Sequence, residues 1–80
     1  MIRISKETSL KPEAVIEKAG RFFGKDGEGM EEKDRTPCCI FFEGAGGHVS
    51  LNIAEEKGKR TVELEAREWE YQAKKFLEQL

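Results

Sequence analysis

Three short stretches in the middle of the chain share one alternation of apolar and polar residues, and this pattern constrains the fold most. They are residues 36–42, 48–54 and 60–66. If residues 44–47 form one turn and residues 57–58 the next, the apolar positions of all three stretches fall on one face. A one-residue slip would move every apolar side chain to the opposite face. The sequence therefore predicts an antiparallel meander of three strands with one apolar face.

This register also predicts which residues lie opposite each other. The first stretch contributes Cys38, Ile40 and Phe42, which pair in turn with Ile53, Leu51 and Val49. The last three then face Val62, Leu64 and Ala66 of the third stretch. The other face of the sheet carries mostly polar side chains, because successive residues of a strand point to opposite sides.

Strand and helix patterns flank the meander. Ile2 and Ile4 alternate with polar residues, as in a short strand, but the sequence leaves the position and direction of this strand open. In residues 12–23 and in about 67–80, apolar side chains recur at helical spacing. The prediction is a two-layer α+β sandwich in the order β-α-β-β-β-α, with both helices on the apolar face.

Between the first helix and the meander lies a strongly polar segment. Residues 24–35 contain three glycines, eight charged residues and one apolar side chain, Met30. Such a composition offers little to bury. We expect a mobile charged surface loop here, within a single domain that spans residues 1–80.

Charge and composition bear on location and partners. The chain carries 14 Lys and Arg against 16 Asp and Glu, and the two signs are interleaved. This balance disfavours binding to nucleic acid or to an anionic membrane. With no basic leader and no apolar run of about 20 residues, a cytoplasmic protein is expected.

The two cysteines stand next to each other. On a strand, Cys38 and Cys39 would point to opposite faces, so we expect no disulfide between them. Cys38 is then a small core residue and Cys39 a partly exposed thiol. With no further cysteine and only His48 as a nitrogen ligand, no metal site or cofactor is predicted.

The polar sheet face is the first candidate for a contact surface. The register sets Phe41 beside Ser50 and Glu65, and an exposed aromatic ring among polar groups can mark an interface. An ordinary solvated sheet face is the alternative. The candidate contact residues are Cys39, Phe41, Glu43, His48, Ser50, Asn52, Glu63 and Glu65, together with Tyr71 as an exposed ring on the last helix.

Other patterns give weaker indications of chemistry. His48 pairs with Glu43 across the hairpin, as in a general acid and base couple, but no nucleophile is placed beside them. The glycines of residues 44–47 suit a tight turn better than a phosphate loop, because a strand and not a helix follows. Trp69 has the spacing of a core residue. No catalytic residue is predicted.

Two family resemblances concern the order of elements. From the first helix onward the chain resembles the double-stranded-RNA-binding domain, with Lys74 and Lys75 in place of its basic patch. Glu65, Arg67, Glu68 and Glu70 stand where that family has lysines, and the three acids among them would repel phosphate. The whole order resembles a shortened helix-grip domain, which implies an apolar ligand between sheet and helices.

These observations rank three functions. The first is a non-catalytic module that acts by protein contact or homodimerisation, through the open sheet face or an edge strand. The second is a carrier of a small apolar ligand. Its expected lining is Phe22, Phe23, Phe42, Trp69 and Phe76. Binding of double-stranded RNA comes last.

Overall fold

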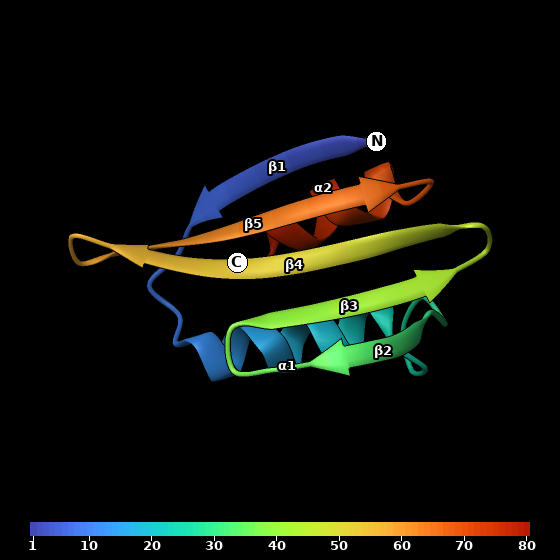
Figure 1. The fold of residues 1–80 in the computed structure, drawn as a ribbon, viewed down its shortest axis with the longest axis horizontal. Coiled ribbons are helices and arrows are strands. Elements are labelled where there is room, and N and C mark those ends of the chain that lie inside the picture. The colour runs from blue at the N-terminus through green and yellow to red at the C-terminus, as the bar shows by residue number, and fades with distance from the viewer.

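A five-stranded antiparallel sheet carries two helices on one of its faces in the computed structural model, which describes residues 1–80 (Figure 1). The elements in chain order are β1 (Ile2–Glu7), α1 (Pro12–Phe23), β2 (Glu31–Arg35), β3 (Cys39–Gly44), β4 (Gly47–Glu56), β5 (Lys59–Arg67) and α2 (Glu70–Glu78). The strands lie side by side in the order β1-β5-β4-β3-β2. The two-layer α+β sandwich predicted from the sequence is confirmed.

The register of the meander is also confirmed. Ile40 lies opposite Leu51, which in turn lies opposite Leu64, and the neighbouring apolar residues follow the same alignment. Each turn has only two residues between the paired strand ends, and both have positive φ. The values are 47° and 78° at Ala45 and Gly46, and 53° and 81° at Lys57 and Gly58. These values fit a type I′ turn, whose twist matches that of the strands and fixes the register.

Both helices cover the apolar face, and their aromatic side chains meet in the layer between helices and sheet. The ring of Phe23 in α1 lies 5.4 Å from that of Phe42 in β3 and 5.4 Å from that of Phe76 in α2. Phe22 also contacts Phe76, at 5.5 Å between ring centroids. The core thus joins both helices to the sheet, and in Figure 1 both helices lie behind the strands.

The first strand takes the outer position beside β5. Ile2 lies opposite Ala66 and Ile4 opposite Leu64, so β1 extends the apolar face by one strand. On the same side, the Lys6 ammonium donates a hydrogen bond of 3.1 Å to the carbonyl oxygen of Leu77, in the last turn of α2. A cation near a helix C-terminus interacts favourably with its partial negative charge. β1 is therefore fastened both to the sheet and to α2.

The charged segment at residues 24–35 differs from its prediction as a surface loop. Its second half forms β2, which pairs antiparallel with β3 and makes the opposite edge of the sheet. Every residue of β2 is exposed, so the strand shows no alternation that a sequence pattern could reveal. The anchor is Met30, immediately before the strand, whose exposed fraction is only 3%. One buried side chain and the backbone pairing are enough to place this strand.

The additional strand has a consequence for the family resemblance. Four strands, not three, separate α1 from α2. The chain therefore departs from the order that suggested a double-stranded-RNA-binding domain.

Both helices are too short and too polar to cross a lipid bilayer.

Candidate functional site

The open face of the sheet brings six of the predicted contact residues together in two rows, and Glu43 and His48 lie beside them in the next row. The first row runs from Phe41 through Ser50 and Glu65 to Arg3, one residue from each of β3, β4, β5 and β1. The second row, one strand repeat away, consists of Cys39, Asn52, Glu63 and Ser5. Three of the four members of each row were predicted from the sequence. Arg3 and Ser5 were missed because the position of the first strand was open.

The first row is linked by side-chain contacts. The rings of Phe41 and His48 stack at 5.7 Å between centroids, with an interplanar angle of 27°. Nε2 of His48 lies 3.6 Å from Oε1 of Glu65, close enough for an ion pair when the imidazole is protonated. The other oxygen of Glu65 accepts a hydrogen bond of 2.8 Å from Nε of Arg3. Phe41 is therefore shielded by a neighbouring ring and is not an isolated apolar patch.

His48 and Tyr71 differ from their expected surroundings. Glu43 is the backbone partner of His48, as predicted, but the imidazole contacts Glu65 on β5 and Phe41 on β3. These contacts are diagonal and depend on the rotamer, which the sequence pattern does not fix. Tyr71 is exposed to 72%, as expected, but it belongs to α2 on the other side of the sheet. The open face and Tyr71 therefore do not form one surface.

The second row begins with Cys39, and the prediction for the cysteine pair to which it belongs is wrong. Cys38 and Cys39 form a disulfide between adjacent residues, and no free cysteine remains. Cys38 is exposed and does not belong to the core. The reason is local: Thr36 and Cys39 exchange backbone hydrogen bonds across a turn that contains Pro37, and β3 begins only at Cys39. The alternation of a strand does not extend back through Cys38.

A shallow hollow of about 330 Å³ lies over β1, β5 and β4 on this face. Its lining is mostly polar and comprises Arg3, Ile4, Ser5, Ser50, Asn52, Glu63, Leu64 and Glu65. Several of these groups already bind one another: Asn52 donates to Glu63 over 3.3 Å, and Arg3 to Glu65. The hollow therefore offers few unengaged groups to a ligand.

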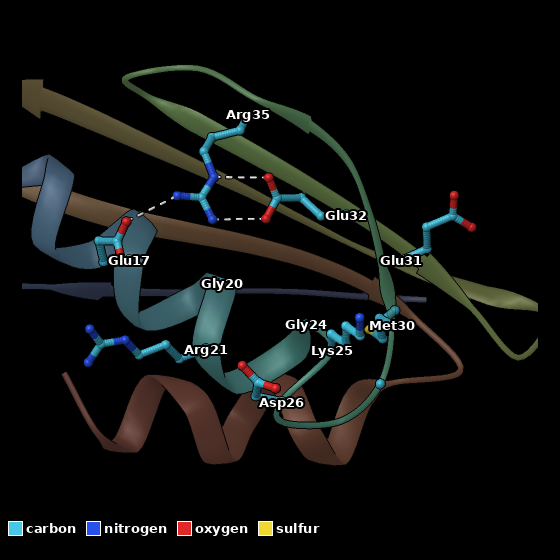
Figure 2. Close-up of a pocket in the computed structure, with 11 residues that line it drawn as sticks. Glu17, Gly20, Arg21, Gly24, Lys25, Asp26, Met30, Glu31, Glu32 and Arg35 are labelled. Carbon is cyan, nitrogen blue, oxygen red and sulfur yellow. Dashed lines mark hydrogen bonds and ion pairs between the residues drawn. The ribbon is translucent and has the colours of Figure 1, made fainter.

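The largest hollow, about 740 Å³, lies between α1 and β2 (Figure 2). Its lining includes the guanidinium of Arg35, which donates two hydrogen bonds, of 2.8 and 2.9 Å, to Glu32 and one of 3.2 Å to Glu17 on α1. The group lies over Gly20, where a Cβ atom would collide with it. The hydrogen bonds to Glu32 are the main cause that raises the pKa of Arg35 above its ordinary value. This network links β2 to α1 through exposed side chains.

The remaining lining of this hollow mixes both charges. Lys25, Arg21, Asp26 and Glu31 surround one apolar residue, Met30, and no hydroxyl, thiol or imidazole is among them. Charges of both signs on one surface cancel much of the local field. The arrangement gives a solvated, internally neutralised surface, without a nucleophile beside a base.

The two sheet edges differ sharply. β2 is short, fully exposed and rich in charge, and its pairing with β3 is shifted by an irregularity between Glu32 and Asp34. Charge and bulges protect an edge against pairing with another chain. β1 is regular over all six of its residues, without a shift in its pairing to β5. Of the two edges, only β1 presents an uninterrupted template.

Comparisons with family models, curated proteins and solved structures find no match for this chain. Its function is therefore inferred from geometry alone. On the open face and in the hollow beside α1, several charged groups already bind one another, among them Arg3 with Glu65 and Arg35 with Glu32. Both edge strands have outward backbone groups without partners, and of the two only β1 is regular over its whole length.

Proposed function

We propose that the protein is a self-association module in which the β1 strands of two copies pair antiparallel and join two sheets into one. The single observation that carries this proposal is the regular, uncovered edge of β1. An exposed edge strand is a template for strand addition, and main-chain hydrogen bonds then supply affinity. The module acts by contact and not by catalysis, in the cytoplasmic setting expected from composition.

The hydrogen bonds between β1 and β5 identify which backbone N–H and C=O groups of β1 remain unpaired on its outer edge. Thr8 N–H donates to the carbonyl oxygen of Arg60 over 3.0 Å, so Thr8 directs its backbone toward β5. In an antiparallel pair this direction alternates from one residue to the next. The N–H and C=O groups of Arg3, Ser5 and Glu7 accordingly face away from β5, toward the outer edge.

Charge complementarity then selects a register. If Ser5 pairs with Ser5 of a second copy on a two-fold axis, each Arg3 lies opposite the other copy's Glu7. Opposite charges directly across a strand pair are favourable. A two-fold axis produces this ion pair twice, because a self-complementary interface repeats each contact. A register centred on Ile4 would place Arg3 opposite Ser5 and Glu7 opposite Met1, so that no arginine side chain would face a carboxylate.

Self-association explains the structure better than carriage of an apolar ligand. Four of the five side chains expected to line a cavity touch one another: Phe22, Phe23, Phe42 and Phe76 form a continuous set of ring contacts. A ligand site of useful size would need these rings to separate. Such a change costs packing energy in a core as small as this one.

Sedimentation velocity over micromolar to millimolar concentrations tests the proposal with charge-reversal variants. Arg3→Glu and Glu7→Arg each place like charges across the proposed pair, and each should weaken dimerisation about tenfold. An equimolar mixture of the two variants restores opposite charges at both positions, so it should form a heterodimer. The double variant Arg3→Glu/Glu7→Arg should dimerise like the parent.

Lys33→Glu, on the opposite edge, is the matched control and should leave dimerisation unchanged. The mixture also controls for any loss of the bond between Arg3 and Glu65 within one copy, since that loss persists in the mixture. A parent protein that stays monomeric up to millimolar concentration contradicts the proposal. So does a mixture that associates no better than its two components.

A further inference from the structure

The disulfide between Cys38 and Cys39, at the start of β3, contributes little to the stability of the fold. Its sulfur atoms do not connect separate elements, because Cys38 and Cys39 are neighbours in sequence. A disulfide stabilises chiefly by closing a loop in the unfolded chain, and here the loop has minimal length. The pair also lies outside the buried core. A structural contribution therefore does not account for it.

The surroundings of the pair permit chemistry. Cys38 borders a surface hollow of about 350 Å³, whose other lining residues are Pro12, Glu13, Pro37, Ile53 and Glu55. Cys38 is exposed and Cys39 is half-buried. A small molecule can therefore reach the sulfur of Cys38 first, with that of Cys39 next to it.

The two oxidation states differ in one contact on the open face. Sγ of Cys39 lies 3.0 Å from Oδ1 of Asn52. In the dithiol, the S–H group of Cys39 can donate to this oxygen, whereas the disulfide carries no such proton. Asn52 in turn donates to Glu63. The S–H group of a reduced Cys39 would thus have an acceptor in Oδ1 of Asn52.

We propose that Cys38 and Cys39 are a thiol–disulfide exchange site for small neutral or cationic disulfides. The thiolate of Cys38 attacks one sulfur of the disulfide RSSR and expels RS⁻, which gives a mixed disulfide. The thiolate of Cys39 then attacks the sulfur of Cys38 and expels the second RS⁻. The two protons lost by the cysteines are taken up by the two leaving thiolates. The protein dithiol is oxidised by two electrons and RSSR is reduced to two RSH.

The negative charge of the hollow beside Cys38 favours cationic disulfide substrates over anionic ones. Both ionisable residues in its lining are acidic, and Glu55 is already paired with Arg60 at 2.9 Å, whereas Glu13 has no ion-pair partner. An uncompensated carboxylate beside Cys38 repels an anionic disulfide and attracts a cationic one. Cystamine should therefore react faster than glutathione disulfide, and the difference should shrink as salt is added.

The test follows oxidation of the full-length dithiol by each reagent. The protein is reduced, freed of reductant without oxygen, mixed with cystamine or glutathione disulfide, and quenched with N-ethylmaleimide for intact-mass analysis. The expected product is lighter than the dithiol by two hydrogens, and both thiols disappear together. The ratio of the cystamine rate to the glutathione disulfide rate should fall about threefold in Glu13→Gln. It should stay constant in Glu28→Gln, a control for net charge.

Single-cysteine variants show the order of attack. Cys39→Ser should accumulate a mixed disulfide on Cys38, and Cys38→Ser should react more slowly, because its remaining thiol is half-buried. The measurement on the parent protein decides the proposal even if a variant fails to fold. A persistent mixed disulfide on the parent chain, a covalent dimer, or two thiols that stay reduced in excess cystamine would each overturn it. An unchanged rate ratio in Glu13→Gln would overturn the charge selection.

Discussion

The indole Nε1 of Trp69 donates a hydrogen bond of 2.9 Å to the carbonyl oxygen of Gly44, and so joins the start of α2 to the turn between β3 and β4. Trp69 is half-buried and packs against the core, as its spacing predicted. Its N–H group, in addition, binds the hairpin between β3 and β4. No other side-chain hydrogen bond connects this turn to a helix. The contact fixes where the second helix crosses the sheet.

Removal of this donor should destabilise the fold. Trp69→Phe keeps an aromatic ring but leaves the Gly44 carbonyl without its partner, which should lower the free energy of unfolding by about 1–3 kcal/mol. Urea denaturation measures the change. Tyr71→Phe, on the exposed face of the same helix, is the matched control and should change stability by less than about 0.5 kcal/mol. Equal effects of the two substitutions would contradict the role of the indole N–H group.

The two glycines that flank the same turn should respond differently to alanine. A Cβ atom at Gly47 would overlap the carbonyl oxygen of Arg67, whereas one at Gly44 meets nothing closer than 3.5 Å. Gly47→Ala should therefore cost about 1–3 kcal/mol or more, and Gly44→Ala should be close to neutral. Thermal unfolding of both variants checks the difference. A Gly47→Ala protein as stable as the parent would show that β5 does not approach the turn this closely.

Ala45 is a site where stability can be gained. Its φ of 47° lies in the left-handed region, which an alanine side chain disfavours and which asparagine tolerates. Ala45→Asn creates the Asn-Gly pair preferred in type I′ turns and should raise the free energy of unfolding by about 0.5–1 kcal/mol. Ala45→Val should lower it, because a β-branched side chain suits this conformation least. The reverse ranking in urea denaturation would exclude the type I′ turn.

Arg35 and Gly20 should be energetically coupled. Gly20→Ala improves helix propensity by about 1 kcal/mol, but its Cβ atom displaces the guanidinium of Arg35 from Glu32 and Glu17. We expect little net gain in the parent and the full gain in an Arg35→Ala background. A double-mutant cycle on unfolding free energies measures this coupling. Strict additivity would mean that Arg35 does not rest on α1.

The carboxylate of Glu70 links stability to pH. A hydrogen bond from its own backbone N–H at the start of α2 is the main cause that lowers its pKa, and the amino group of Met1, 3.4 Å away, adds to this effect. Because the pKa is lower in the folded state, this contribution is present above the unfolded pKa and is lost as the pH falls through the folded value. Glu70→Gln should flatten the acid limb of the stability profile. An NMR titration of the Glu70 side chain that gives an ordinary pKa would contradict it.

The meander could be predicted in detail because two kinds of information agree there. Alternation aligned the strands, and two short turns fixed the offset, so Ile40, Leu51 and Leu64 lie where the pattern put them. The helices followed from their apolar stripes. The boundaries of the last helix were less accurate, since α2 begins at Glu70 and ends at Glu78.

The features that were missed depend on contacts without a periodic signal. β2 is exposed along its whole length, and Met30 was the only apolar residue that pointed to burial nearby. Cys38 lies in the turn before β3, so it does not follow the alternation of the strand. Pro37 was a signal in the sequence for such a turn. On the open face, the backbone neighbours of His48 were predicted, but its contact with Glu65 depends on a rotamer.

Concentration-dependent hydrogen exchange tests the β1 pairing most directly, because it observes the backbone groups themselves. The amides of Arg3, Ser5 and Glu7 should exchange fast in dilute solution and become protected as the concentration rises. The amide of Glu32, in the opposite edge strand, should exchange at one rate throughout. If the three β1 amides exchange fast at every concentration, the strand does not pair with a second copy, and the proposed self-association is wrong.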